Sequence, residues 1–348
     1  MVTIKEIAKA VGVSSATVSR VLNYDPVLSI SPAKRQAIIE TAEALNYETP
    51  RNRNKANGAA APSPLTKLVI VHFLEPSDEI ADPYYVGVRL GIETRCRDLK
   101  TEIVKAFHSD ALPDAGLLDS ASGVIVIGKH SDNEIAWLTE HARHVVFADF
   151  DPKNDRIDSV FSDMALATLK ILQSLKSSGY GRVGFIGSHE SLNGSVQHFA
   201  ERRCAAYIDW QTKNHSFDPA LLALADCSGG QSLRLETGYR LARELLALSE
   251  RPDVIVTSND NMAIGAYRAI QEAGLSIPND IAVISYNDIP VAQFLTPPLT
   301  TVRIHGEHIG ETAVDLLLER LCGRNYGKQV RIATELIWRD SCRKPLES

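Results

Sequence analysis

From residue 67 onward, short apolar runs alternate with amphipathic stretches of helical length, and this alternation constrains the possible folds strongly. The runs include KLVIVHF, GVIVIG, HVVFADF, RVGFIG, PDVIVTS and IAVISY, and the stretches include MALATLKILQSLKSSG and NMAIGAYRAIQEAG. Continuous apolar runs of this length are typical of parallel strands that are buried on both faces. Strands that alternate with helices predict a doubly wound α/β fold with right-handed crossovers.

The region 67–348 is too long for one lobe, because single hydrophobic cores rarely grow past about 250 residues. We therefore expect two α/β lobes, with the chain crossing between them near 158–163 and again near 288–300. The predicted N-lobe comprises about 67–160 and 289–303. The predicted C-lobe comprises about 161–288 and 304–340.

Residues 1–47 show a different pattern, that of three short helices. The first ends at Gly12, since glycine adopts a left-handed cap easily. Ser14 is a suitable N-cap for the second, and Ser31 followed by Pro32 starts the third. The third helix is expected to run to about residue 46 and to bury Ile38, Ile39, Ala42 and Leu45. Two short helices joined by a glycine turn and braced by a third form a helix-turn-helix unit, whose second helix enters the DNA major groove.

The exposed face of the second predicted helix suits DNA. Small side chains at Ser15 and Ala16 allow close approach to base edges, while Arg20 can reach guanine or phosphate. Ser19 and Asn23 can bond to phosphates or bases. The alternative is an ordinary three-helix lid with a polar face.

The charge of the chain is unevenly distributed. Residues 1–60 carry eight basic and five acidic side chains, a formal charge of +3, whereas the whole chain carries −6 and residues 61–348 therefore carry −9. A basic head on an acidic body predicts an anionic partner for the head.

The segments TIKEIAKAVGVSSATVSRVLN and AEALNY resemble the DNA-binding head of the LacI/GalR family of transcription factors. The resemblance implies that Ser15 and Ala16 choose operator bases, while Ser19, Arg20 and Asn23 contact DNA. The expected DNA-binding set is Lys5, Ser15, Ala16, Thr17, Ser19, Arg20, Asn23 and Lys55.

Residues 48–66, ETPRNRNKANGAAAPSPLT, have no apolar period and predict a linker. In the family this segment becomes a short hinge helix on DNA, from which a leucine wedges into the minor groove. Here the corresponding position is Lys55, which cannot unstack a base step as leucine does. A flexible basic tether is the alternative to a working hinge helix.

Polar and aromatic side chains follow several predicted strands at their carboxyl ends, where ligands of such sheets bind. Carboxylates and amides that face aromatic rings suit a sugar, because its hydroxyls need polar partners while its ring face stacks. Each residue also has a structural alternative: Asp260 can cap a helix, Asp149 and Asn287 can close turns, and the tyrosines can belong to the core. The candidates at these strand ends are Phe73, Tyr84, Tyr85, Asp149, Asn259, Asp260 and Asn287.

The segments TSNDNMAIGAYRAIQEAGLSIPNDIAVISYNDIP and PPLTTVRIH resemble the effector-binding core of the same family, so the resemblance spans almost the full chain. It implies a two-lobed, periplasmic-binding-protein-like domain over 67–348. It also adds Arg203 in RRCAAY to the effector contacts, because a guanidinium fork bonds two hydroxyls or a carboxylate. The alternative is a surface arginine. The segments DPYY, GIE and NDIP resemble those of the family's enteric β-galactosidase repressors, which implies galactose or a β-galactoside as effector.

These features predict a dimeric repressor whose two heads read a pseudo-palindromic operator and which a small sugar releases. Leucine heptads for a four-chain coiled coil are absent from the C-terminal sequence, so we expect a homodimer. One alternative is a corepressor-type regulator that binds DNA only with its ligand. Another is a sugar-binding protein of the transport type, which would need an export signal.

Enzymatic activity is not expected. The sequence has no G-x-S-x-G motif, P-loop or complete G-x-G-x-x-G motif, and its histidines and five cysteines form no ligand cluster. We therefore expect neither a metal nor a cofactor. Because neither a secretory signal nor a membrane span is visible, we expect a cytoplasmic protein that does not bind membranes.

Overall fold

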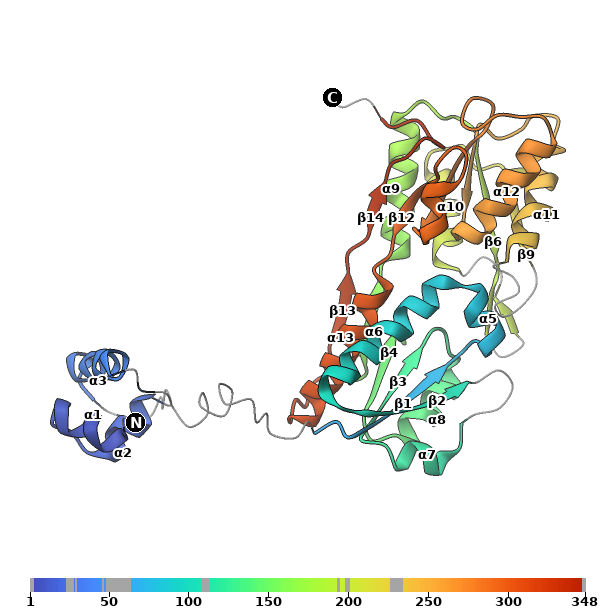
Figure 1. Cartoon of the computed structure of the whole chain (residues 1–348). Helices are drawn as coiled ribbons and strands as arrows, with labels where there is room; N and C mark the ends of the chain where they lie inside the picture. The colour runs from blue at the N-terminus through green and yellow to red at the C-terminus, as the bar shows by residue number, and fades with distance from the viewer. Residues whose placement is uncertain are drawn as a thin grey trace. The chain divides into compact units, whose positions relative to one another are not determined.

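The computed structural model divides the chain into two compact units, residues 1–63 and 64–348 (Figure 1). The predicted contacts Asn23 and Lys55 lie outside the described residues, as does most of the predicted linker. The structure describes residues 3–22, 28, 30–45, 47, 64–107, 113–192, 195–197, 201–225 and 234–345.

The first unit contains the three predicted helices, α1 (Ile4–Val11), α2 (Ser15–Leu22) and α3 (Pro32–Ala44). Helix α1 ends at Gly12, whose φ of 68° is the left-handed conformation expected there. Helix α2 begins after Ser14, whose Oγ accepts a hydrogen bond from the Thr17 backbone N–H at 3.1 Å. The caps predicted from the sequence are therefore confirmed.

The three helices share a small apolar core. Residue Leu45, which was expected in this core, is 39% exposed, because it follows the last residue of α3. The sequence prediction was wrong at this position. The buried residues of the core are Ile7, Ala8, Val18, Val21, Ile38 and Ala42, and Ile39 packs against them.

The second unit has two lobes, each built on a six-stranded sheet. The N-lobe sheet is entirely parallel, in the order β13-β5-β4-β3-β1-β2. Its strands are β1 (Lys67–His72), β2 (Glu102–Phe107), β3 (Gly123–Ile127), β4 (Val145–Ala148), β5 (Asp158–Ser162) and β13 (Gln329–Ile332). The helices of this lobe are α5 (Pro76–Ala81), α6 (Pro83–Leu99), α7 (Ala115–Asp119), α8 (Asp132–His141) and α13 (Gly306–Leu321).

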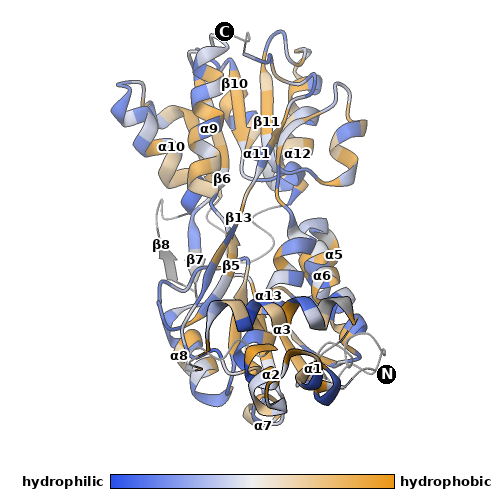
Figure 2. Cartoon of the chain, turned by 90° about the vertical axis from the view of Figure 1, so that its left-hand side faces the viewer, coloured by the Kyte–Doolittle hydropathy of each residue, from blue (hydrophilic) through white to orange (hydrophobic). Residues whose placement is uncertain are grey.

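The C-lobe sheet has the order β14-β12-β11-β10-β6-β9, with only β14 antiparallel to its neighbour. Figure 2 shows β10 and β11 coloured as hydrophobic, as expected for buried parallel strands. The strands are β6 (Val183–Ser188), β9 (Leu222–Ala225), β10 (Val254–Thr257), β11 (Ala282–Asn287), β12 (Thr300–Arg303) and β14 (Glu335–Ile337). The α-helices are α9 (Met164–Ser177), α10 (Arg202–Lys213), α11 (Leu235–Leu246) and α12 (Asp260–Glu272). Two 3-10 turns, η1 (Pro219–Leu221) and η3 (Pro290–Phe294), and a small hairpin, β7 (Glu190–Leu192) with β8 (Ser195–Gln197), complete the described elements.

Segments 289–303 and 304–332 lie in the opposite lobes to those predicted, whereas β14 lies in the C-lobe as predicted. The first crossing, between β5 and α9, falls where expected. The segment 289–303 belongs to the C-lobe, because β12 pairs with β11, and the following α13 and β13 belong to the N-lobe. Helix α13 packs closely on α6 because glycines lie at the contact: a Cβ at Gly310 would come within 2.1 Å of the Val88 carbonyl oxygen.

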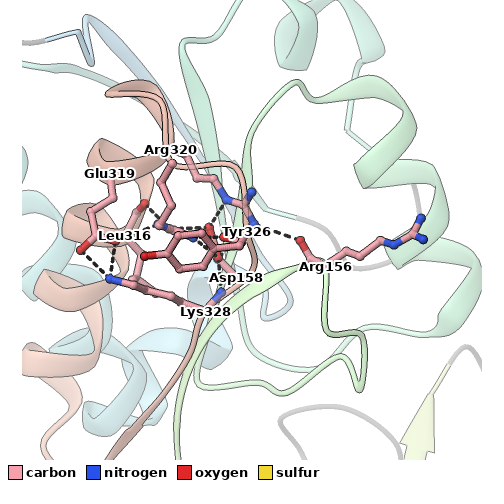
Figure 3. A network of polar contacts seen from close by, with 8 residues as sticks. Arg156, Asp158, Leu316, Glu319, Arg320, Tyr326 and Lys328 are labelled. Atoms are coloured by element: carbon pink, nitrogen blue, oxygen red, sulfur yellow. Dashed lines mark hydrogen bonds and ion pairs between the residues drawn. The ribbon is translucent and has the colours of Figure 1, made fainter. Parts of the chain in front are cut away.

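A buried ion-pair network fastens α13 to the N-lobe sheet (Figure 3). Asp158, at the start of β5, is fully buried and accepts hydrogen bonds from Arg320 at 2.6 Å and from Arg324 at 2.8 Å. Burial raises the pKa of Asp158, but these guanidiniums outweigh burial and lower it overall. The carboxylate therefore stays charged and joins α13 to β5.

No described helix is both long and apolar enough to cross a lipid bilayer.

Candidate functional site

Helix α2 of the first unit presents the predicted DNA-reading face. Its buried side holds Val18 and Val21, whereas Ala16 and Arg20 are exposed. Lys5 on α1 is exposed as well, while Ser15, Thr17 and Ser19 are half-buried. The Thr17 hydroxyl lies 2.8 Å from Ser14 Oγ, so it takes part in the helix cap. The exposed face therefore combines a small side chain with a guanidinium.

A cleft lies between the lobes of the second unit. It encloses about 690 Å³, including its opening to solvent. Six of the eight predicted effector residues line it: Tyr84, Tyr85, Asp149, Arg203, Asn259 and Asn287. The other lining residues are Asp82, Lys129, Phe150, Asp151, Phe161, Ser162, Met164, Arg202 and Ile304.

The N-lobe wall combines Tyr84, Tyr85 and Asp82 at the start of α6 with Asp149, which follows β4. The Tyr84 hydroxyl donates to Asp149 Oδ1 at 2.7 Å, and Asp82 caps α6 by accepting from the Tyr84 backbone N–H at 3.2 Å. The rings of Tyr84 and Tyr85 meet edge to face, 5.0 Å apart. Burial raises the pKa of Asp82 to about 6, and it also raises the pKa of Asp149 against the lowering effect of Tyr84. This wall therefore offers hydrogen-bond acceptors beside aromatic surface.

Two polar residues of the cleft have left-handed backbone. The φ angles are 61° at Asp149 and 111° at Asn287, values uncommon for residues other than glycine. The carboxylate of Asp288 anchors the second loop by ion pairs with Arg303 at 2.8 Å and Arg339 at 2.7 Å. Asp149 and Asn287 thus form tight turns and also line the cleft. The turn role and the position in the candidate site, which were considered as alternatives, apply to both residues.

Arg203 at the start of α10 is the most constrained cation of the cleft. Its Nε donates to Glu201 Oε1 at 2.9 Å, and its Nη1 donates to the Ser258 carbonyl oxygen at 2.6 Å. The guanidinium also lies 5.6 Å from the ring centre of Tyr286. Burial lowers the pKa of Arg203, but Glu201 and Tyr286 outweigh burial and raise it overall. Arg203 is therefore fixed in the cleft wall and is not an ordinary surface arginine.

Each described cation that lines the cleft has a carboxylate partner, although Asp151 is shared with Lys153 at 2.6 Å. Besides Arg203 with Glu201, Lys129 pairs with Glu190 at 2.7 Å, and Arg202 pairs with Asp151 at 3.4 Å. By contrast, the described residues provide no ion-pair partner for Asp82 or Asp149, which accept hydrogen bonds from Tyr84. The cleft consequently offers more acceptor capacity than positive charge.

Phe73 and Asp260 do not line the cleft. The Asp260 carboxylate accepts from the Ile289 backbone N–H at 2.9 Å and from the Thr301 hydroxyl at 2.7 Å, beneath the C-lobe wall. Asn259 caps α12, a role considered for Asp260. Burial raises the pKa of Asp260 to about 7. Phe73 contacts Tyr85 edge to face at 4.9 Å and so supports that ring.

Several residues that line the cleft were not predicted from the sequence. Some of them could have been found from their position at the carboxyl end of a strand. Lys129 follows the run GVIVIG and Ser162 ends β5, so both lie at strand carboxyl ends. Asp151 comes two residues after Asp149, and Arg202 adjoins Arg203. Met164 and Ile304 carry no comparable signal, because they lie where the chain passes between the lobes.

Comparisons with known proteins agree with this architecture. Residues 3–50 match the family described as "Bacterial regulatory proteins, lacI family", and residues 172–342 match a "Periplasmic binding protein-like domain". The HTH-type transcriptional repressor MelR of Bacillus subtilis (strain 168) is 35% identical over 98% of this chain and 98% of its own length.

Two further similarities concern a short relative and the fold. The lactose operon repressor of Rhizobium radiobacter is 71% identical over 113 residues, 32% of this chain and all of that sequence. The crystal structure of the lac repressor dimer bound to operator and the anti-inducer ONPF aligns with a TM-score of 0.65 and 23% identity, covering 98% of both chains. The latter similarity concerns the fold alone.

Proposed function

We propose that this chain, which belongs to the lacI family of bacterial regulatory proteins, represses a galactoside-utilisation operon and leaves its operator when a galactoside binds. The observation that carries the proposal is the cleft, in which acceptors, aromatic rings and a fixed guanidinium face one space. A regulator that binds operator DNA acts in the cytoplasm, the location expected from the sequence.

The polar groups of the cleft favour an uncharged sugar. Asp82, Asp149 and Asn287 accept hydrogen bonds from hydroxyls, while the tyrosine rings contact the apolar face of a pyranose. An anionic ligand has to compete with Glu190, Asp151 and Glu201 for the three cations. We therefore infer a free galactoside as effector, and not a sugar phosphate. The relative from Rhizobium radiobacter supports this choice, because lactose is a β-galactoside.

The effector acts by changing the balance between arrangements of the lobes. Its contacts come from both lobes, with Tyr84 and Asp149 on one side and Arg203 and Asn287 on the other. A ligand that binds one lobe arrangement better than another shifts the population toward it, by a coupling of about 1–3 kcal/mol in typical cases. Release from DNA requires that this favoured arrangement be the one with lower DNA affinity.

A second copy of the chain is the partner that the operator requires, since two half-sites need two heads. The exposed large apolar side chains of the body include Ile80, Leu90, Val291 and Phe294. Leu90 borders the same surface hollow as Pro290, at the start of η3, which places α6 and η3 on one face. We assign this face to the homodimer.

Thermal unfolding of the full-length protein tests the ligand assignment. Galactose, lactose, glucose, ribose, a purine and galactose 6-phosphate are compared, each over a range of concentrations. A ligand at about 100 times its dissociation constant adds about 2.7 kcal/mol of stability and raises the transition by a few degrees. We expect a rise with galactose or lactose only. A rise with galactose 6-phosphate or the purine contradicts the proposed effector, but leaves the DNA-binding proposal standing.

A further inference from the structure

A second hollow, of about 730 Å³, lies at the opposite edge of the N-lobe sheet from the cleft. It is bordered by Val145 at the start of β4 and by Ile157 just before β5, and the strands of this sheet are parallel. The hollow therefore lies at the amino ends of the strands. None of the described residues that line it is acidic, whereas Arg143, His144 and Arg156 are basic, as is Arg320 from α13.

The basic side chains of this hollow carry positive charge that the neighbouring carboxylates do not cancel. Arg320 and Arg324 share the buried Asp158, and Glu319 pairs with both Arg324 and Lys328, so three cations of this network face two carboxylates. Arg156 accepts a hydrogen bond from Arg320 through its backbone oxygen at 3.0 Å, while its side chain extends away from the network (Figure 3). Arg143 and Arg156 are both exposed, and the described residues offer neither of them an ion-pair partner.

The surroundings make this concentration of positive charge unusual. Residues 61–348 carry a formal charge of −9, so a hollow whose described lining is basic and neutral departs from the character of the body. Thr139 and Asn154 also line it and supply neutral hydrogen-bonding groups. Two guanidinium forks beside hydroxyl and amide groups match the planar, bidentate recognition of phosphate oxygens.

We propose that this hollow binds a phosphate group of the DNA backbone. Strand β1 begins at Lys67, so the chain from the DNA-binding head enters the body at the same edge of the sheet as the hollow. DNA that is held by the head is thus linked to this edge through residues 48–66. The choice of DNA as the source of the phosphate rests on the proposed operator binding, whereas the phosphate chemistry of the hollow does not.

The first test compares salt dependence of DNA binding in the full-length protein. The double variant R143Q/R156Q removes two exposed charges from the hollow, and K170Q/K213Q removes two from exposed lysines of α9 and α10. Fluorescence anisotropy with one labelled duplex is recorded between about 50 and 200 mM salt. The slope of log K against log salt should fall by about 0.9 for each phosphate that R143Q/R156Q no longer binds, and should not change in the lysine control. Equal thermal transitions of both variants and wild type establish that folding is unchanged.

A second test uses inorganic phosphate alone, added at constant ionic strength against chloride, with the thermal transition as the readout. In one outcome, phosphate raises the thermal transition of wild type but not of R143Q/R156Q, while the salt dependence of DNA binding is the same in both proteins. This outcome assigns the hollow to a free phosphate and overturns the DNA assignment. Unchanged behaviour in both tests overturns the phosphate site altogether. If wild type fails to bind any duplex, the operator proposal fails, and the phosphate titration still decides the chemistry of the hollow.

Discussion

The head and the cleft both use polar side chains, but the two regions arrange them in opposite ways. On α2, Ala16 and Arg20 are exposed side chains of one short helix, held in place by a core behind them. In the cleft, Arg203 and Asp149 come from different lobes and are fixed by partners before any ligand arrives. A surface for DNA can therefore be built locally, whereas a pocket for a small polar ligand depends on the packing of the whole domain.

Arg203→Ala should have the strongest consequence, and it acts on the cleft. The substitution leaves Glu201 buried without its cation, and removal of one partner of a buried pair costs about 3–5 kcal/mol. Urea unfolding followed by tryptophan fluorescence measures this loss, because all three tryptophans lie in the body. Arg202→Ala is the matched control: its pair with Asp151 is more exposed, and its loss should cost below about 1 kcal/mol. Equal losses of unfolding free energy in the two variants would show that the Arg203 contacts stabilise the body no more than the Arg202 contact does.

Asp82→Asn tests whether burial of the charged Asp82 carboxylate destabilises the folded body. Burial raises the pKa of Asp82 to about 6 in the folded chain, above its ordinary value of 3.8. The folded state therefore binds more protons between these values, and body stability falls as pH rises from about 4 to 6, by at most about 3 kcal/mol. The asparagine variant should lack this contribution and be more stable at pH 7, since its side-chain oxygen can still cap α6.

The control for Asp82→Asn is Asp209→Asn on the exposed face of α10, which should leave the pH profile unchanged. If the Asp82 variant keeps the wild-type loss of stability between pH 4 and 6, the carboxyl is not the source of that loss.

Arg20→Ala tests the contribution of the head to DNA affinity. Loss of one guanidinium contact to a base or phosphate should weaken operator binding by about 1–3 kcal/mol. The stability of the body and its response to galactosides should not change, because Arg20 lies in the separate first unit. Anisotropy on a duplex selected from a random pool measures the first effect. An affinity equal to wild type would remove Arg20 from the interface.

Ser14→Ala, which removes the side-chain cap of α2, should have the mildest consequence. Loss of an N-cap hydroxyl costs about 1 kcal/mol. The helical signal of the head, followed by circular dichroism, should melt earlier, while the tryptophan transition of the body stays in place. A simultaneous shift of both transitions would contradict the independence of the two units.

The contrast between head and cleft also explains which parts of the molecule could be predicted from the sequence. The caps at Gly12 and Ser14 depend on neighbouring residues only, so they were predictable. The strand-end rule found Asp149 and Asn287 because both follow long apolar runs. Nothing in the sequence separates Asn259 from Asp260, yet the first lines the cleft while the second binds Ile289 and Thr301 beneath it.

The lobe to which each C-terminal segment belongs could not be predicted from the sequence pattern. Segments 289–303 and 304–340 both suit an α/β lobe, so periodicity cannot assign either of them. The choice depends on contacts between distant segments, namely the close packing of Gly310 against Val88 and the pairing of Arg320 with Asp158.

The proposed function depends above all on one coupling: an uncharged galactoside in the cleft lowers the affinity of the head for DNA. The anisotropy of full-length protein on its selected duplex, during titration with lactose, galactose and galactose 6-phosphate, measures this coupling. We expect release by a neutral galactoside, no release by the sugar phosphate, and loss of the response in Arg203→Ala at temperatures where that variant is folded. Tighter DNA binding with the sugar, as in a corepressor, or release by the sugar phosphate would show that the coupling is not the one proposed.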